Sequence, residues 1–236
     1  MKRIFVLTVV LTVCSLAAFA QKGVRFGVKV APTINIAKYD SNGKEIKSAD
    51  VKTGIGFTPG LIFDYGITDN VAIGTGLNLS IRSFAIKESS GSFSNETKYN
   101  LTYVELPVNL KLKTNGLGGT GIHAKFQTGP TFDFKVGASA NSENNVIIYD
   151  KGKNKIGKHI NLININWAFG GGIEWDIEKV GTVDIGVAYH LALTNVLNHN
   201  YELTVGGSTS KPYEGYNLKV SYIGINLGFY LPTSGE

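Results

Sequence analysis

A strict alternation of apolar with small or polar side chains runs through residues 54–81, and it constrains the fold of this chain more than any other feature. A period of two is the signature of a β-strand whose two faces meet different surroundings. A short turn at 66–70 divides the stretch into two strands, which together predict a β-hairpin. The apolar face holds Ile55, Phe57, Pro59, Leu61, Phe63, Tyr65, Val71, Ile73, Leu77, Leu79 and Ile81.

The same unit recurs along the chain. Most of the alternating runs exceed the roughly 9–11 residues that a tilted strand needs to cross a bilayer. We therefore predict an all-β fold, an eight-stranded antiparallel up-and-down transmembrane β-barrel after a cleaved signal peptide. The predicted strands span residues 24–38, 52–67, 71–87, 99–113, 122–138, 161–177, 183–197 and 217–231.

The connections between these strands alternate in length. Long segments follow the odd strands and short ones follow the even strands, as in outer-membrane barrels, whose short turns lie in the periplasm. This pattern predicts an integral outer-membrane protein with both termini in the periplasm. The long segments are 39–51, 88–98, 139–160 and 198–216, and the short ones are 68–70, 114–121 and 178–182.

The first 20 residues have the organisation of a secretory signal peptide. Lys2 and Arg3 precede an apolar stretch at 4–16, and Ala18 and Ala20 form a small-x-small cleavage site. A buried N-terminal helix and a lipidated Cys14 are the alternatives. Cys14 is the single cysteine, so the domain predicted at 21–236 forms no disulfide. The net charge of +5 is too small to indicate a nucleic-acid partner.

The alternation alone does not say which face points inward, because a soluble lipocalin-like barrel with an apolar lumen also alternates. The size of the side chains on the two faces favours an outward-facing apolar face. The apolar face of the sixth strand carries Trp167, Phe169 and Trp175, and the opposite face carries Gly170 and Gly172. An eight-stranded barrel has room inside only for side chains or one small ligand. We therefore predict a lipid-facing apolar exterior, with the soluble ligand carrier as the alternative.

The inward face then carries charges of both signs. Unpaired charges away from water are costly, so these groups should pair and plug the lumen. A charge-lined conduit, that is, a narrow pore for small solutes, is the alternative. The predicted lumen network is Arg82, Glu105, Lys111, Lys125, Asp133, Lys135, Glu174 and Asp176.

Aromatic residues near the predicted strand ends are candidates for the two membrane-interface girdles. The ordinary preference of aromatic residues for strands is the alternative explanation. Phe26, Tyr65, Trp175 and Phe229 lie at the periplasmic ends, and Tyr39, Phe84 and Tyr99 lie at the outer ends.

Residues 103–111, which read Tyr-Val-Glu-Leu-Pro-Val-Asn-Leu-Lys, form the most recognisable segment. The segment resembles the tyrosine-x-glutamate-leucine/isoleucine-proline motif of the PorT-like outer-membrane β-barrel proteins of Bacteroidota, a porin-type family. The resemblance implies a barrel built by the outer-membrane assembly machinery and linked to protein secretion or surface assembly. Pro107 donates no ladder hydrogen bond, so we expect a bulge or a strand end there.

Motifs for catalysis, cofactors or metals are weak in this sequence. Residues 116–121 match the dinucleotide pattern GxGxxG, but no helix follows them. The four histidines are scattered, which does not fit a metal site. Ser80 and His190 could meet in the lumen as a hydrolase pair, without supporting spacing. We expect neither an enzyme nor a bound cofactor.

The third long loop carries a cluster of lysines, Lys151, Lys153, Lys155 and Lys158. Such a cluster is a candidate contact for lipopolysaccharide phosphates or an acidic partner; a solvated loop is the alternative. We therefore predict an outer-membrane barrel with a filled lumen that acts as a structural, accessory or surface-binding protein.

Overall fold

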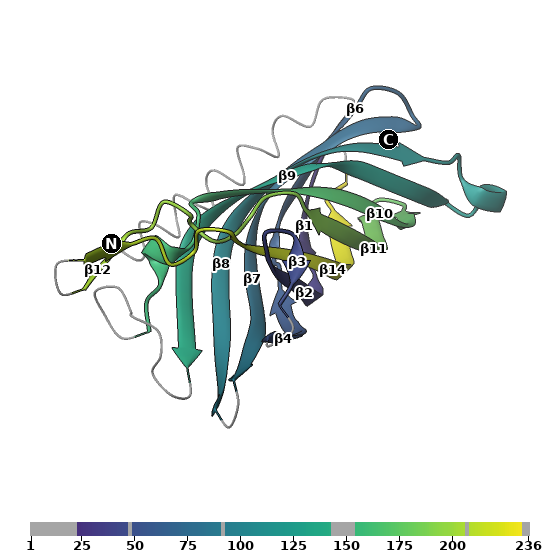
Figure 1. The fold of residues 1–236 in the computed structure, drawn as a ribbon. Helices are drawn as coiled ribbons and strands as arrows, with labels where there is room; N and C mark the ends of the chain where they lie inside the picture. Colours follow the sequence, from purple (N-terminus) through teal and green to yellow (C-terminus); the bar gives the residue numbers. More distant parts are fainter. Residues whose placement is uncertain (1–22, 47–48, 91–92, 143–153, 206–207, 233–236) are drawn as a thin grey trace, which may run out of the picture.

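The computed structural model describes residues 23–46, 49–90, 93–142, 154–205 and 208–232 (Figure 1). The predicted signal peptide lies outside the described residues. The strands are β1 (Val24–Val30), β2 (Pro32–Ser41), β3 (Lys44–Glu45), β4 (Ala49–Lys52), β5 (Gly54–Phe57), β6 (Gly60–Gly66), β7 (Val71–Ser90), β8 (Phe93–Lys113), β9 (Ile122–Ser142), β10 (Ile163–Ile177), β11 (Gly181–Ala192), β12 (Leu203–Val205), β13 (Ser208–Ser210) and β14 (Tyr216–Tyr230). Two 3-10 helices, η1 (Leu117–Gly119) and η2 (Gly157–His159), lie in connections. In the described ranges, no helix has the length and apolar character to cross a membrane.

The strands close into one antiparallel ring. Its order is β1-β14-β11-β10-β9-β8-β7-β6, and pairing of β6 with β1 completes the circle. β2 continues β1, and β5 and β4 continue β6, so the ring has eight spans, each beside its neighbours in the sequence. Around the middle of the barrel, closure pairs both edges of the sheet. The predicted eight-stranded up-and-down barrel is confirmed.

Three local predictions need correction. Most of the predicted loop 88–98 is strand, because β7 and β8 continue to pair as far as Ser90 and Phe93. The predicted loop 198–216 contains the small β12–β13 hairpin. Pro107 causes no bulge: the ladder keeps its register there, and the shift between β8 and β9 falls at Thr102/Tyr103.

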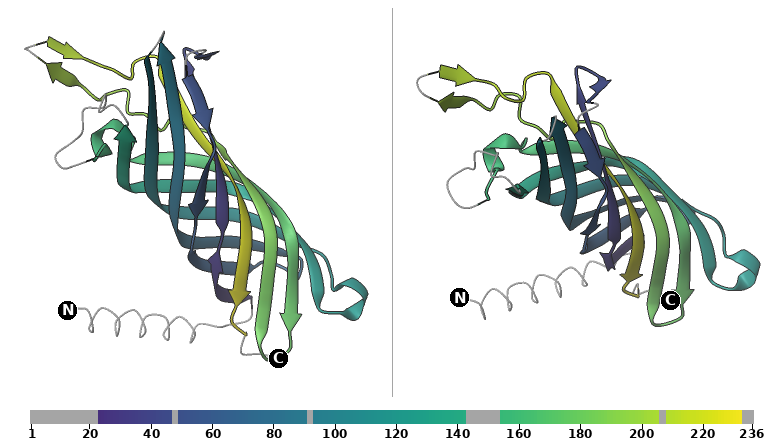
Figure 2. Two further views of the ribbon diagram at one scale, coloured as in Figure 1. Left: turned by 90° about the horizontal axis from the view of Figure 1, so that it is seen from below. Right: turned by 60° about the horizontal axis from the view of Figure 1, so that its bottom comes forward.

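The two ends of the barrel differ in their connections (Figure 2). We call one the short-turn end, since it carries the β6–β7, β8–β9 and β10–β11 turns and both ends of the described chain. We call the other the long-loop end; there β7 and β8 reach past their neighbours and the β12–β13 hairpin projects outward. The alternation of long and short connections predicted this arrangement.

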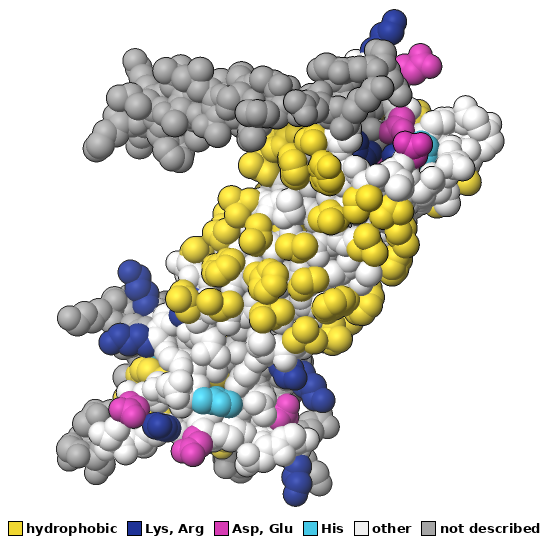
Figure 3. All heavy atoms as spheres, turned by 90° about the horizontal axis from the view of Figure 1, so that it is seen from above, with side chains coloured by type: hydrophobic (Ala, Val, Ile, Leu, Met, Phe, Trp, Pro, Cys, Tyr) yellow, Lys and Arg dark blue, Asp and Glu magenta, His cyan; other side chains and the backbone are white. Residues whose placement is uncertain are grey.

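The outward face of the barrel is apolar over its middle part. In Figure 3, hydrophobic side chains cover the centre of the visible face, and charged ones gather towards its ends. Leu77 is 53% exposed and Trp175 is 49% exposed, although both side chains are large and apolar. Glycines on the inward face permit close packing: a Cβ on Gly172 would lie 2.1 Å from the carbonyl oxygen of Ile185. The predicted facing of the two parities is therefore correct over this apolar belt.

Beyond the belt, towards the long-loop end, the two faces exchange character. On β14, Lys219 is exposed between Leu218 and Val220, which are buried. On β7, Phe84 and Ile86 are buried and Lys87 is exposed. The long-loop end is thus packed like a water-soluble barrel, with an apolar interior. The predicted outer aromatic girdle is wrong, because Phe84, Tyr99 and Tyr39 belong to or pack against this interior.

Candidate functional site

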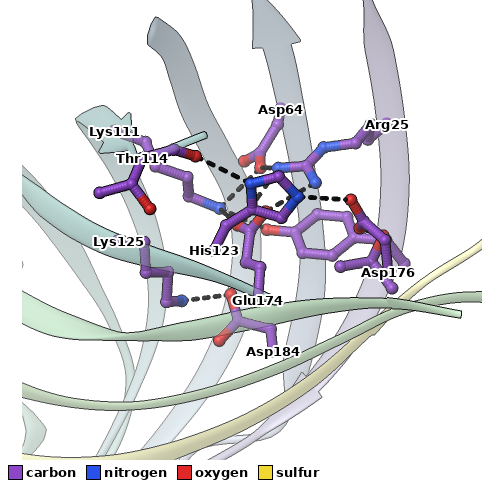
Figure 4. A network of polar contacts seen from close by, with 11 residues as sticks. Arg25, Asp64, Lys111, Thr114, His123, Lys125, Glu174, Asp176 and Asp184 are labelled. Atoms are coloured by element: carbon purple, nitrogen blue, oxygen red, sulfur yellow. Dashed lines mark hydrogen bonds and ion pairs between the residues drawn. The ribbon is translucent and has the colours of Figure 1, made fainter. Parts of the chain in front are cut away.

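The lumen next to the short-turn end holds a compact cluster of ion pairs (Figure 4). The guanidinium of Arg25 donates to Glu174 at 2.7 Å and to Asp64 at 2.9 Å. The ammonium of Lys111 donates to the same two carboxylates, to Asp64 at 2.6 Å and to Glu174 at 3.2 Å. It also donates to the hydroxyl of Tyr230 at 2.6 Å. Two cations and two carboxylates thus satisfy one another across four strands.

Lys125 and Asp184 add a further pair beside this cluster. Lys29, on β1, also faces the lumen, but it makes no ion pair with any described residue and is balanced only by more distant carboxylates, among them Glu105 and Asp184. It lines a cavity of about 40 Å³ together with Lys125 and Asp184. That volume admits only a few water molecules.

A second cluster lies further along the lumen and is centred on Arg82. Its guanidinium donates to Glu105 at 2.6 Å and to Asp133 at 2.7 Å. The Tyr222 hydroxyl donates to Glu105 at 2.9 Å, and the rings of Tyr103 and Tyr222 lie 4.9 Å and 4.3 Å from the guanidinium carbon. All these side chains are buried. We call this group the Arg82 cluster.

An apolar plug fills the lumen at the long-loop end. It combines inward side chains of β7, β8, β9 and β14 with residues of two long connections. The first, beside η2, folds back over the end of β9 through the hydrogen bond from Ile156 N to Ala138 O. The plug consists of Phe84, Ile86, Leu101, Tyr103, Ala140, Ile156, Ile160, Val196, Leu197, Leu218 and Val220.

The ion pairs next to the short-turn end, the Arg82 cluster and the plug form three layers, which follow in the same order on each strand that contributes to them. Along β8, Lys111 is in the layer next to the short-turn end, Glu105 is in the Arg82 cluster and Leu101 is in the plug. The lumen is therefore filled by side chains over most of its length. The spaces found among the described residues are the small cavity beside Lys29 and a pocket of about 270 Å³ at the short-turn end, lined in part by Arg25 and Lys111.

Comparison with known proteins agrees with this architecture. Residues 19–198 match the family model described as "Outer membrane protein beta-barrel domain". The chain belongs to this family. It is therefore an integral outer-membrane β-barrel, and its apolar belt faces lipid.

Solved structures with a similar fold are outer-membrane proteins as well. OprG from Pseudomonas aeruginosa has a TM-score of 0.50 at 10% identity, over 89% of this chain and 96% of OprG. Neisserial surface protein A has a TM-score of 0.43 at 13% identity, over 89% and 99% of the two chains. AlkL has a TM-score of 0.44 at 10% identity, over 89% and 92%. No curated protein sequence matches this chain.

Six of the eight residues predicted for the lumen network of this outer-membrane barrel lie in buried ion pairs. Two do not. Lys135 donates to the backbone carbonyls of Gly157 and Ile160, and so holds the η2 connection against β9. Asp176 is exposed at the short-turn end, where it accepts a hydrogen bond from Thr182 and lies 3.1 Å from His123 Nε2. Both residues occupy inward positions of their strands, as predicted. The alternation does not give the level along the barrel axis, and these two residues lie outside the levels of the buried ion pairs.

Four charged residues of the lumen were missed: Arg25, Lys29, Asp64 and Asp184. Each occupies the inward parity of its strand, so the alternation that identified Lys111 and Glu174 also marks these four positions. What the sequence lacks is the pairing, since Arg25 and Glu174 are 149 residues apart.

The predicted lysine contact in the third long loop is only partly described. Lys151 and Lys153 lie outside the described residues. Lys155 and Lys158 are exposed on either side of the buried Ile156. Ile156 belongs to the plug, so this part of the loop packs against the barrel.

The residues weighed for catalysis have other contacts. The Ser80 hydroxyl accepts hydrogen bonds from Thr58 and from Arg82 Nε, and the His190 ring stacks on Tyr222 at 4.1 Å between centroids. His159 contacts the Tyr213 hydroxyl and stacks on Tyr201. Within the described part of the chain, no group of three or more histidine, cysteine, aspartate or glutamate residues could hold a metal ion.

Proposed function

We propose that this protein is a non-conducting outer-membrane barrel that acts as a structural, accessory or surface-binding protein through its long-loop end. In this proposal the long-loop end faces the outside of the cell, and both termini lie in the periplasm. The filled lumen carries the argument, because it leaves the exposed ends of the barrel as the places where partners can bind.

The layered lumen argues against a pore. A solute would have to displace paired charges at two levels and then an apolar plug, and opening buried ion pairs one at a time leaves uncompensated charge. Wide aqueous channels occur in barrels with about 16 or more strands. A lipocalin-like carrier is disfavoured too. Small-molecule pockets typically enclose about 300–1,000 Å³ and are lined mainly by apolar side chains. The cavity beside Lys29 has only about 40 Å³, and the pocket of about 270 Å³ at the short-turn end is lined by charged residues such as Arg25 and Lys111.

We also propose that the protein is not an enzyme. A serine nucleophile needs a base within hydrogen-bond reach, whereas the Ser80 hydroxyl is occupied by Thr58 and Arg82.

The resemblance to PorT-like proteins supports a narrower version, in which the barrel serves protein secretion or surface assembly in a Bacteroidota cell. Its partners would be the barrel assembly machinery during biogenesis and a secretion or surface protein afterwards. In this barrel the key residues of the recognisable segment, Tyr103 and Glu105, both contact Arg82. The motif therefore has a structural role in the lumen, and the secretion role rests on the resemblance alone.

The closed lumen can be tested by electrical recording in planar lipid bilayers. Purified barrel should give no steady unitary conductance at either polarity, whereas a 16-stranded porin reconstituted in the same way should. Steady, ohmic steps from the purified barrel would contradict the proposal and favour the narrow pore.

The surface role can be tested by site-specific photocrosslinking on intact cells. Photoreactive residues at Lys44 and Asn200, both exposed at the long-loop end, should yield discrete protein adducts. The matched position is Asn115, exposed in the β8–β9 turn. Adducts formed only from Asn115 would place the partner at the short-turn end and contradict the proposed surface role.

A further inference from the structure

Two lysines stand directly opposite each other on the outer surface of the β2–β14 pair. Lys38 is the register partner of Lys219, and both side chains are exposed. In an antiparallel pair, side chains directly opposite have Cβ atoms about 4.5–5.5 Å apart, and like charges at that position are destabilising. Neither ammonium group makes an ion pair or hydrogen bond within the described ranges of the chain.

A neighbouring carboxylate, that of Asp40, is held by other hydrogen bonds. Asp40 accepts hydrogen bonds from Asn217 Nδ2 and from Gly43 N, both at 3.0 Å. These bonds, with the positive charges of Lys38 and Lys219 near them, hold the pKa of the Asp40 carboxyl below its ordinary value. Asp40 therefore stays ionised and only partly offsets two lysines, so this part of the surface keeps a net positive charge.

Two other outward lysines at the same end of the barrel have acidic neighbours. Lys52 pairs with Glu96 at 2.5 Å. Lys87 has Asp50 as its register partner on β4 and Glu96 on β8. Lys113 and Lys125 are also register partners, on β8 and β9, but Lys125 is buried and pairs with Asp184. Among the ladders of the described residues, the direct opposition of two exposed lysines is thus found at the β2–β14 pair.

The lysine pair lies at the edge of the lipid-facing belt. On β2 the next outward residues towards the short-turn end are Ile36, 42% exposed, and Ile34, 51% exposed. Ile223 is the register partner of Ile34 on β14. Behind the lysines, the inward residue Val220 already belongs to the apolar plug. The two charges therefore occupy the headgroup level, directly above an apolar strip that lies in the bilayer.

We propose that Lys38 and Lys219 clamp the phosphate of an anionic membrane-lipid headgroup whose acyl chain lies along Ile36 and Ile34. Lysines bind phosphate as compact point charges, and basic groups beside a membrane attract anionic lipids. A phosphate between the two ammonium groups would remove their mutual repulsion. The apolar strip below identifies the occupant as a lipid, since a free phosphate or a soluble acidic protein has no acyl chain to pack against it. With the long-loop end outside the cell, as proposed above, the lipid is the phosphorylated glycolipid of the outer leaflet.

Native mass spectrometry of the detergent-purified barrel with added lipid A tests the clamp. Wild type should retain diphosphorylated lipid A, and Lys38→Gln/Lys219→Gln should lower its affinity about 30-fold, since each of the two lysines near an anionic surface contributes about 1 kcal/mol and about 1.4 kcal/mol is a factor of ten. The matched control is Lys44→Gln/Lys211→Gln, which removes the same charge from exposed positions elsewhere at this end. Lys38→Arg/Lys219→Arg should keep the lipid. Heat-modifiable gel mobility checks that each variant is folded.

Equal occupancy in Lys38→Gln/Lys219→Gln and wild type would overturn the clamp. So would equal retention of dephosphorylated lipid A by wild type, since the apolar strip alone would then account for binding. Displacement of lipid A by millimolar inorganic phosphate would overturn the assignment to a lipid. These outcomes are independent of conductance, so a failed clamp is distinguishable from a failed closed-lumen proposal.

Discussion

The two halves of this barrel are built from the same strands but are packed in opposite ways. Around the apolar belt, the exterior is hydrophobic and the interior holds charges, such as Lys111 and Glu174. At the long-loop end, the exterior is charged and the interior is a hydrophobic core containing Leu101 and Leu218. On β7 the change occurs within a few residues, between Arg82 and Ile86, both inward and both buried.

The contrast shows that the surrounding medium selects the chemistry of each face. In lipid the hydrophobic effect provides no drive for an apolar interior, so polar groups go inside, where they satisfy one another. In water the usual drive returns and the interior becomes apolar. The position where the faces exchange therefore marks the membrane boundary, and the Lys38–Lys219 pair lies at that position.

Removing the central cation of the charged half should have the largest effect. Arg82→Leu leaves Glu105 and Asp133 buried without their counter-charge, and breaking a buried pair in this way costs about 3–5 kcal/mol. The free energy of unfolding in urea, measured in detergent micelles, checks this. The triple variant Arg82→Leu/Glu105→Gln/Asp133→Asn should recover most of the loss. A loss as large in the triple variant as in Arg82→Leu would mean that packing, and not charge, dominates this layer.

Truncation in the apolar half should cost somewhat less. Leu218→Ala opens a cavity in the plug, and buried Leu→Ala changes cost about 2–5 kcal/mol. Leu227, on the same strand, faces outward in the belt and is the matched control. Leu227→Ala should lower the free energy of unfolding much less, because lipid or detergent fills the space. Equal losses in the two variants would contradict the soluble-type packing of the plug.

The exteriors of the two halves can be compared with an added charge. Leu77→Arg, in the middle of the belt, should destabilise by about 2–4 kcal/mol, since a lipid-facing arginine is costly at the bilayer midplane. Asn100→Arg, exposed on β8 towards the long-loop end, should have little effect. Refolding into lipid vesicles gives both values. A harmless Leu77→Arg would remove the argument that the belt faces lipid.

The smallest expected effect is a pH dependence at the long-loop end. The pKa of Asp40 is lowered by its hydrogen bond from Asn217 and by that from the Gly43 amide. A lowered native pKa stabilises the β2–β3 turn above the unfolded value of about 3.9, and this stabilisation is lost as the pH falls through the native pKa. The protection factor of the Gly43 amide, which compares its hydrogen-exchange rate with the intrinsic rate at the same pH, should therefore fall in acid. Asp40→Asn should show a flatter profile, and an unchanged profile would mean that another group is responsible.

The residues that carry the family resemblance have structural roles in this barrel. Tyr103 and Glu105 both contact Arg82 in the lumen. These residues are needed to fill and close a small barrel of this kind. They predict an outer-membrane β-barrel, which the family match confirms. The narrower PorT-like assignment stays a prediction, and these residues do not identify a partner.

The sequence by itself determined the number and order of the strand spans, the lipid-facing parity of the belt and the two kinds of connection, because each is a local pattern of period two interrupted by turn residues. The tertiary structure decided which groups meet. The pairing of Arg25 with Glu174, the assembly of a plug from distant loops and the opposition of Lys38 to Lys219 all depend on strand register. Register is fixed only when the ring closes, and a slip of one residue would turn every side chain of a strand to the other face.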